Sequence, residues 1–303
     1  MTPIVVAFTQ NYYVPVAVML RSLLDSSRGA YYVVCLLTEE LPGRMRRNLE
    51  SLDSGRLKFE YRNLGGRLKD VPVDPRYTEA AMFRLLLPDL LPEYDSVVYA
   101  DCDMIMRQDV DALFSGTDLG DNYLAAVFEA PIENQAERFE SVGCVATEYF
   151  NSGFLLMNLK QLREEGVVAK FLEASKREDL EFPDQDVLNM VCRGRVLQLA
   201  PIYNGIRTFF LPQYKADFQK RYSISEWEEV QEKGSIHYTG GKPWNLFTVK
   251  FGEWWRTCET LPREIRDEWT PNPKVLRLWK IYRTKPGGWC IDMLQAVYRS
   301  IKK

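Results

Sequence analysis

Two aspartates separated by one residue follow a short apolar run, and this spacing could support metal chemistry. Residues 97–100 have the β-branched and aromatic composition of a buried strand, and they are followed by Asp101, Cys102 and Asp103. Successive side chains of a strand point to opposite faces, so Asp101 and Asp103 would share one face and Cys102 the other. Two converging carboxylates are unfavourable unless a cation lies between them or one takes up a proton. The pattern indicates either a divalent-metal site or acids in a solvated loop, and the tripeptide alone does not decide between them.

A second group of chemically capable residues surrounds the only histidine of the chain. Residues 235–244 read SIHYTGGKPW and contain His237, Gly240 and Lys242. A lone histidine is more often a satisfied polar residue than a metal ligand. Here the glycines allow the backbone to approach an anion and Lys242 adds a cation, which together suit a diphosphate. A glycine turn that closes a sheet edge would explain the glycines but neither His237 nor Lys242.

The segments around the acidic pair alternate between strand patterns and helix patterns. Before the pair, we expect strands over residues 4–8, 31–37 and 57–61, and helices over 14–24, 41–52 and 75–88, the last stopped by Pro88. After the pair, we expect strands over residues 124–128, 154–157 and 196–199, and helices over 162–177 and 186–191. Alternating strands and helices predict an α/β domain with a mostly parallel central sheet. The carboxyl ends of its strands would carry the ligand site.

Composition and charge describe a folded, mildly acidic body with a basic end. The 303 residues are 46% hydrophobic and 13% aromatic, which excludes a disordered chain and suffices for a large core. The formal net charge is −3, but residues 274–303 carry eight Lys and Arg against one acid. Residues 1–273 therefore carry −10, and we expect no nucleic-acid partner.

The C-terminal segment has the composition of an amphipathic, basic tail. Pro271 and Pro273 mark the expected boundary region, and we divide the chain into a catalytic domain over 1–265 and a tail over 266–303. Tryptophan and aliphatic residues alternate there with Lys and Arg, which suits the interface of an anionic membrane. The alternative is a terminal helix that packs on the body with its basic face in water.

Cysteine usage favours a reducing compartment. The six cysteines show neither paired spacing nor a Cys-x-x-Cys sequence, so we expect no disulfide framework and no zinc site. The N-terminus lacks the pattern of a signal peptide, and no window approaches the ~20 apolar residues of a membrane span. We expect a cytoplasmic protein, with peripheral contact at the inner face of the membrane as a further expectation for the tail.

Six segments, taken in order, resemble the retaining glycosyltransferases of family 8, which include glycogenin and the bacterial lipopolysaccharide galactosyl- and glucosyltransferases. The resemblance covers about residues 3–255, and its segments are residues 7–12, Arg84, 101–103, 150–153, 183–186 and 237–244. It implies a single GT-A-type, Rossmann-like domain. The implied activity is metal-dependent transfer of glucose or galactose from a UDP-sugar to a hydroxyl of a glycan or a lipid-linked saccharide.

The resemblance also implies a role for each matching residue. The donor-binding residues would be Ala7, Thr9, Asn11, Tyr12, Arg84, Asp101, Cys102, Asn151, Gly240 and Lys242. The metal, Mn²⁺ or Mg²⁺, would be held by Asp101, Asp103 and His237, and imidazole in this set favours Mn²⁺. The catalytic residues would be Gln185, Asp184 and Asp103.

The chemistry implied by these roles is departure of a diphosphate from the anomeric carbon. The metal and Lys242 would stabilise the leaving group. The amide of Gln185 is too weak a nucleophile, so we favour front-face attack with retention of configuration; a covalent route would need Asp184 or Asp186. Two alternatives are a glycogenin-like protein that glucosylates its own tyrosine and a metal-dependent phosphohydrolase.

Overall fold

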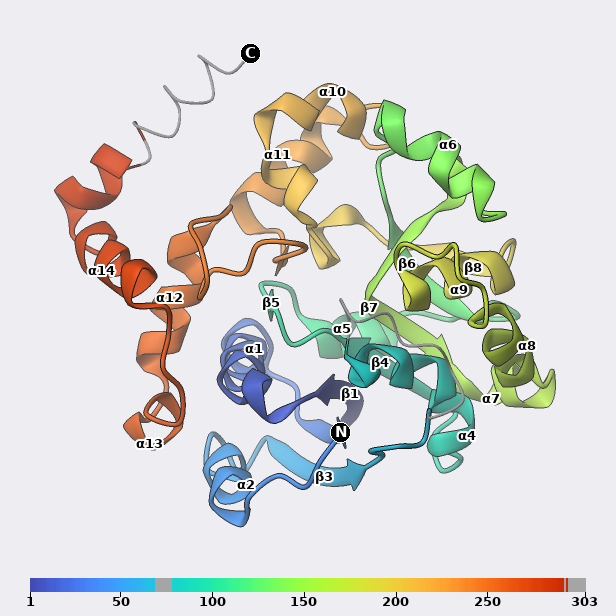
Figure 1. Cartoon of the computed structure of the whole chain (residues 1–303), viewed down its shortest axis with the longest axis horizontal. Helices are drawn as coiled ribbons and strands as arrows, with labels where there is room; N and C mark the ends of the chain where they lie inside the picture. The colour runs from blue at the N-terminus through green and yellow to red at the C-terminus, as the bar shows by residue number, and fades with distance from the viewer. Residues whose placement is uncertain (69–77, 292, 294–303) are drawn as a thin grey trace.

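The centre of the molecule is a seven-stranded sheet (Figure 1). The computed structural model describes residues 1–68, 78–291 and 293. The strand order is β3-β2-β1-β4-β7-β6-β8. The strands are β1 Thr2–Phe8, β2 Tyr31–Leu37, β3 Leu57–Asn63, β4 Ser96–Ala100, β6 Leu124–Phe128, β7 Phe150–Asn158 and β8 Val196–Gln198. Neighbouring strands are parallel except where β7 meets β4 and β6. The predicted α/β class with a mostly parallel sheet is confirmed.

The direction of β7 explains why distant residues meet at one edge of the sheet. Because β4 and β6 are both antiparallel to β7, they run in the same direction. The residues that follow β4 and β6 therefore lie beside the beginning of β7. The Asp101 N–H donates to the Gly153 carbonyl at 2.8 Å, and the Glu129 N–H donates to the Tyr149 carbonyl at 2.8 Å. We call this end of the sheet the carboxyl edge.

Helices cover both faces of the sheet. The main helices are α1 Tyr13–Ser26, α2 Gly43–Glu50, α5 Val110–Gly116, α6 Glu133–Ser141, α7 Leu159–Glu164, α8 Val167–Ala174, α9 Pro183–Val191, α10 Lys215–Phe218, α11 Ile224–Lys233, α12 Phe251–Thr260, α13 Arg263–Arg266 and α14 Pro273–Tyr282. Alternate side chains of β1 enter two separate cores: Ile4 and Val6 pack with α1 and α12, whereas Val5 packs with α7, α8 and α9. Figure 1 shows α1 and α12 together, well away from α8 and α9.

Two of the predicted helices are not continuous in the structure. Residues 75–77 of the helix expected over 75–88 lie outside the described residues, and the rest forms α3 Glu79–Met82, a 3-10 turn over Phe83–Leu86 and α4 Leu87–Leu90. Pro88 lies in the first turn of α4, where no N–H is needed, so it does not stop the segment. The helix expected over 162–177 is divided into α7 and α8 by Gly166, whose φ of 61° is left-handed.

A short second sheet carries the histidine segment to the carboxyl edge. β5 Met104–Ile105 pairs antiparallel with β9 Ile236–His237, and Met104 lies opposite His237. Neither strand is predicted from the sequence pattern. The strand expected over residues 154–157 is also longer than predicted, since β7 begins at Phe150, where residues 150–153 already pair with their neighbours.

Part of the predicted tail packs on the body. In α14, Val275 and Trp279 are buried, and the Trp279 ring stacks on Trp255 of α12 at 5.9 Å. The Trp279 indole N–H also donates to Glu259 at 2.9 Å. Residues 292 and 294–303 of the predicted tail lie outside the described residues. Within the described ranges, no helix is long and apolar enough to cross a bilayer.

Candidate active site

Asp101, Asp103 and His237 converge at the carboxyl edge. Each offers one ligand atom, and these atoms lie within 4.8 Å of one another. The His237 Nε2 atom is 3.3 Å from Asp103 Oδ1 and 3.6 Å from Asp101 Oδ2. The end of β4 supplies the aspartates, and the pairing of β5 with β9 places the histidine beside them. The structure thus brings together the three residues that the sequence analysis named as metal ligands.

The donor set of this cluster fits a divalent cation. Two carboxylates and one imidazole nitrogen are the ligand types that suit Mn²⁺, and Mg²⁺ accepts the carboxylates. The other ring nitrogen, His237 Nδ1, faces the amide oxygens of Asn151 at 3.1 Å and Asn204 at 3.0 Å. Because Nδ1 makes these hydrogen bonds, the ring of His237 can present the lone pair of Nε2 to the aspartates.

Lys242 also reaches the cluster. Its ammonium group donates to the Asp103 carboxylate and, at 2.8 Å, to the Tyr238 carbonyl. Burial alone would raise the pKa of Asp103, but the charges of Lys242 and His237 outweigh it and hold that pKa below its ordinary value. The turn that delivers Lys242 contains Gly240 at a left-handed φ of 80°. Lys242 therefore places a fixed positive charge where a diphosphate would meet the aspartates.

Arg84 connects the acidic pair to the opposite wall of the site. Its guanidinium donates to Asp101 Oδ1 at 2.7 Å and to the Ser152 carbonyl at 2.7 Å, and Arg84 Nε is 3.3 Å from Asp184 Oδ2. The guanidinium also lies 4.4 Å from the centre of the Tyr99 ring. Burial raises the pKa of Asp101, although the charge of Arg84 opposes this. Arg84 is buried and held from three sides, so it is a rigid part of the site.

Gln185 is at the centre of a group of hydrogen-bonded side chains next to the acidic pair. We call this group, Glu129, Tyr149, Asn151, Ser152, Asp184 and Gln185, the amide wall. Its side-chain oxygen accepts from Asn151 Nδ2 and from the Ser152 N–H, both at 3.0 Å. Its side-chain nitrogen donates to Glu129 Oε1 and to the Tyr149 hydroxyl, both at 3.1 Å. Asp184 joins the same wall by accepting from the Ser152 hydroxyl at 2.9 Å. Asn151, which was expected to bind the donor, thus lies together with Asp184 and Gln185, which were expected to be catalytic.

Glu129 is a site residue that the sequence analysis missed. It follows β6 directly and lies at the carboxyl edge, where it accepts hydrogen bonds from Gln185 and, at 3.4 Å, from Asn151. Burial raises the pKa of its carboxyl group, and the hydrogen bonds from Asn151 and Gln185 oppose that rise. Its position immediately after a predicted buried strand was a usable signal, because the same signal identified Asp101.

Asp186 is occupied by contacts that hold the wall together. One carboxylate oxygen accepts from the Tyr149 hydroxyl at 2.5 Å and from Arg138 at 2.9 Å. The other accepts from the backbone N–H groups of Glu181 at 3.1 Å and Phe182 at 3.0 Å. Its exposed fraction is 0%. These contacts favour a structural role for Asp186 over that of a nucleophile, which was one option left open by the sequence analysis.

The residues expected to bind the nucleotide lie at the end of β1 and in the turn that follows it. Ala7 is half-buried, and Thr9 and Asn11 belong to the polar turn that follows the strand. Tyr12 packs edge-on against Trp244 with ring centres 5.8 Å apart, next to Lys242. Tyr12 also lies close enough to Lys242 and Asp103 for their charges to act on its hydroxyl group, whose pKa burial raises.

Cys102 points away from the metal cluster, as strand alternation predicts. Its Sγ atom lies 3.6 Å from the Ala7 carbonyl, and burial raises the pKa of the thiol well above its ordinary value. All six cysteines are free, as expected from their spacing. Any contact between Cys102 and a donor would therefore come from its backbone or the apolar flank of its side chain.

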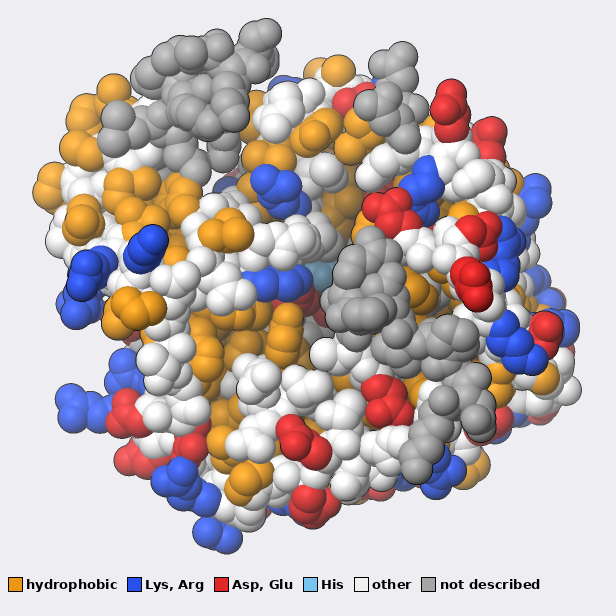
Figure 2. Space-filling model, viewed as in Figure 1, with side chains coloured by type: hydrophobic (Ala, Val, Ile, Leu, Met, Phe, Trp, Pro, Cys, Tyr) orange, Lys and Arg blue, Asp and Glu red, His pale blue; other side chains and the backbone are white. Residues whose placement is uncertain are grey.

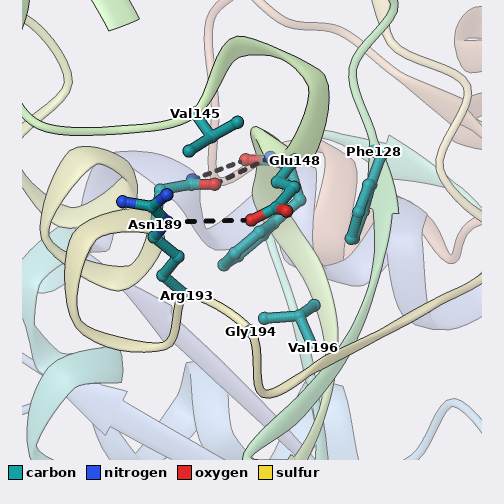
Figure 3. Close-up of a pocket in the computed structure, with 8 residues that line it drawn as sticks. Phe128, Val145, Glu148, Asn189, Arg193, Gly194 and Val196 are labelled. Atoms are coloured by element: carbon teal, nitrogen blue, oxygen red, sulfur yellow. Dashed lines mark hydrogen bonds and ion pairs between the residues drawn. The ribbon is translucent and has the colours of Figure 1, made fainter. Parts of the chain in front are cut away.

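A separate hollow of about 180 Å³ lies on the other side of β6 and β7 (Figure 3). Phe128 and Phe150 line it, and they precede Glu129 and Asn151 in the chain, so they point to the opposite face. Figure 3 shows Arg193 and Glu148 facing each other across the hollow, at a distance of 3.9 Å. The hollow contains none of the predicted site residues.

A mostly parallel α/β sheet with two aspartates, a histidine and an amide wall at its carboxyl edge is the architecture of a GT-A-type glycosyltransferase. The sequence model of Glycosyl transferase family 8 matches residues 3–247, and the chain belongs to that family.

Individual relatives agree with this family. General stress protein A of Bacillus subtilis (strain 168) is 28% identical over 215 residues, which cover 66% of this chain and 73% of that protein. Lipopolysaccharide glucosyltransferase WaaO of Escherichia coli (strain K12) is 26% identical over 247 residues, 78% of this chain and 70% of that protein. The structure of the galactosyltransferase LgtC in complex with donor and acceptor sugar analogs superposes with a TM-score of 0.72 and 24% identity, over 88% of this chain and 100% of LgtC. The likeness to LgtC shows a shared fold.

Proposed function

We propose that this glycosyltransferase is a metal-dependent, retaining hexosyltransferase that uses a UDP-hexose donor, UDP-glucose or UDP-galactose. The acceptor would be a hydroxyl group of a glycan or a lipid-linked saccharide. The observation that carries the proposal is the convergence of Asp101, Asp103 and His237 beside the wall built on Gln185, to which Asn151 and Arg84 connect them. A cation cluster facing a wall of amides and carboxylates suits a substrate with a diphosphate at one end and a sugar at the other.

Different residues of the chain would act on the diphosphate and on the sugar of the donor. Asp101, Asp103 and His237 would hold Mn²⁺ or Mg²⁺, which when bound supplies Lewis-acid stabilisation to the diphosphate. Lys242 would contribute a second, fixed positive charge to the leaving group as the sugar–phosphate bond breaks. Arg84 contacts both Asp101 and Asp184, so it would fix the position of the residues that bind the sugar of the donor relative to those that bind its diphosphate.

Front-face attack is the route that the wall favours. A covalent intermediate needs a carboxylate that is free to bond the anomeric carbon. Asp186 has both oxygens occupied, and Asp184 is held by Arg84 and Ser152. Gln185 presents an amide whose oxygen already accepts two hydrogen bonds. We therefore infer that the acceptor hydroxyl attacks from the side of the departing diphosphate, whose oxygen takes the proton.

A donor-hydrolysis screen tests the proposal. The protein would be incubated with Mn²⁺ and a panel of UDP-sugars, and released UDP would be measured without any acceptor. The proposal predicts UDP release from UDP-glucose or UDP-galactose, and no release of inorganic phosphate from simple phosphate esters tested alongside. Phosphate release from those esters would instead support a phosphohydrolase. If the donor carries a radiolabelled sugar, covalent attachment of the label to the protein would support self-glycosylation.

The C-terminal helices supply a surface that suits an anionic membrane, and we propose that they bind one peripherally. Ile281, Trp289 and Met293 expose 56%, 65% and 47% of their surface, and Lys280 and Lys285, which are also exposed, belong to the same stretch of the chain. Figure 2 shows hydrophobic side chains gathered at the end of the molecule that carries α14, with basic side chains beside them. Aromatic and aliphatic groups beside ammonium groups favour the lipid interface, where each basic residue contributes about 1 kcal/mol. Such contact would bring a lipid-linked acceptor to the enzyme.

Replacing both Ile281 and Trp289 with Ser should weaken binding to vesicles that contain phosphatidylglycerol by about tenfold, because two inserting side chains are lost. The matched control is Ile224→Ser on α11, since Ile224 is exposed to 54%, nearly the same fraction as Ile281. Co-sedimentation at low and high salt measures the effect. Equal binding by the double variant, or an equal loss in the control, would contradict the membrane role.

A further inference from the structure

Asn204 is a fully buried polar residue beside the metal cluster, and the backbone fixes it there. It precedes Gly205, which forms a parallel bridge with Ile236 of β9. The Gly205 N–H donates to the Ser235 carbonyl and the His237 N–H donates to the Gly205 carbonyl, both at 2.9 Å. A Cβ atom on Gly205 would lie 2.6 Å from the Ser235 carbonyl oxygen, so only glycine allows this close approach.

The orientation of two amide groups can be assigned from one backbone donor. The Gly153 N–H lies 3.0 Å from an amide atom of Asn151, and a backbone N–H can only donate, so that atom is the oxygen, Oδ1. An amide atom of Asn204 lies 2.9 Å from the same oxygen. It must be a donor, which makes it the nitrogen, Nδ2. The Asn204 oxygen consequently points toward His237.

The same reasoning assigns the proton on His237. Its Nδ1 atom lies 3.1 Å from Asn151 Oδ1 and 3.0 Å from Asn204 Oδ1. Both atoms are acceptors, so Nδ1 carries a hydrogen that the two oxygens share. In the neutral ring, Nε2 then bears the lone pair, and it faces Asp101 and Asp103.

We propose that Asn204 is a positioning residue that, together with Asn151, fixes the ring orientation and the tautomer in which His237 meets the metal. The inference rests on the proposed metal-dependent function and adds a residue to it. Partners of this kind, on the far nitrogen of a ligating histidine, raise metal affinity because the ring need not be reoriented on binding. Asn204 lies in an irregular segment more than thirty residues before His237, so neither spacing nor periodicity could indicate the role.

The first test is Mn²⁺ binding by Asn204→Ala, measured by electron paramagnetic resonance of free Mn²⁺ and independent of turnover. We expect a loss of affinity of about ten- to a hundredfold. The matched control is Asn189→Ala, because Asn189 is also buried and also makes amide hydrogen bonds, to the Phe150 backbone. It does not face His237, so its loss should reduce thermal stability and leave Mn²⁺ affinity unchanged.

The second test reads the ring directly, because His237 is the only histidine of the chain. In protein labelled with ¹⁵N-histidine, a metal-free long-range ¹H–¹⁵N spectrum should show a proton on Nδ1 in the wild type. In Asn204→Ala, we expect a second population with the proton on Nε2. A role confined to packing would lower stability without redistributing the proton.

The outcomes separate this inference from the proposed function. Absence of Mn²⁺ binding by the wild type would overturn both. Binding by the wild type with equal affinity in Asn204→Ala would overturn only the role of Asn204. A wild-type spectrum in which Nδ1 carries no proton would overturn the assigned tautomer, whatever the activity of the enzyme.

Discussion

Asp103→Asn is expected to abolish glycosyl transfer, with a fall in kcat/KM of about 10³-fold or more. The amide keeps the size of the side chain but removes a negative ligand of the metal cluster and the partner of Lys242. The fall should appear in steady-state assays over a range of UDP-hexose concentrations, and excess EDTA should reproduce it in the wild type.

Asp25→Asn is the control for this substitution. Asp25 is half-exposed on α1 and pairs with Arg21 one helical turn away, far from the carboxyl edge. Its loss should leave activity unchanged, because an exposed ion pair of this kind contributes less than about 1 kcal/mol to stability. Full activity of Asp103→Asn, or of the wild type in EDTA, would show that the cluster is not a metal site.

Gly153→Ala is expected to lower kcat/KM by about 10²-fold, because small displacements of catalytic groups have effects of that size. A Cβ atom at this position would lie 2.2 Å from His237 Cε1 and 2.8 Å from Asp101 Oδ2. One of these two side chains must move, and the distance between the His237 ring and the Asp101 carboxylate then changes. Parallel measurement of Mn²⁺ affinity should show that metal binding weakens together with catalysis.

Gly116→Ala provides the comparison for Gly153. An added Cβ atom at Gly116 meets nothing within 4 Å, so the substitution should be silent. Circular dichroism would establish that both variants keep the secondary structure of the wild type. Wild-type activity and wild-type Mn²⁺ affinity in Gly153→Ala would mean that His237 does not need its present position.

The parts of the site that could be predicted are those set by local sequence. Residues 97–100 predict a buried strand, and continuing its alternation past the strand end predicts Asp101 and Asp103 on one side and Cys102 on the other. The side chains are arranged in this way, although β4 ends at Ala100 and residues 102–103 form a turn. The sheet itself follows from alternating strands and helices, and its order and direction agree with the expected α/β class. These inferences need no knowledge of distant contacts.

The parts that could not be predicted depend on pairing between distant segments. β5 and β9 have two residues each, too few for periodicity, so the pairing that places His237 beside Asp103 could not be predicted; only the family resemblance indicated His237. Asn204 joins the site through the bridge at Gly205, which no local pattern indicates. Glu129 follows a predicted strand, but its meeting with the wall depends on the direction of β7. Helix boundaries failed for a different reason, since one glycine at a positive φ divides the segment that forms α7 and α8.

The helical end of the chain shows the limit of composition as evidence. Its mixture of basic and aromatic residues was compatible with a membrane surface or with packing on the body. The structure shows which residues of this helix pack on the body, because Trp279 is buried against α12 while Ile281 is exposed. Composition cannot make that distinction, since it depends on which face of the helix meets α12.

The most direct test of the central claim is the anomeric configuration of the hexose released from the donor. The protein would be incubated with Mn²⁺ and the UDP-hexose that supports hydrolysis, the reaction stopped with a chelating resin, and the product read by ¹H nuclear magnetic resonance before mutarotation. A retaining enzyme with this site should release the α-anomer first, and only when the metal is present. Initial release of the β-anomer, or equal release without metal, would contradict the account.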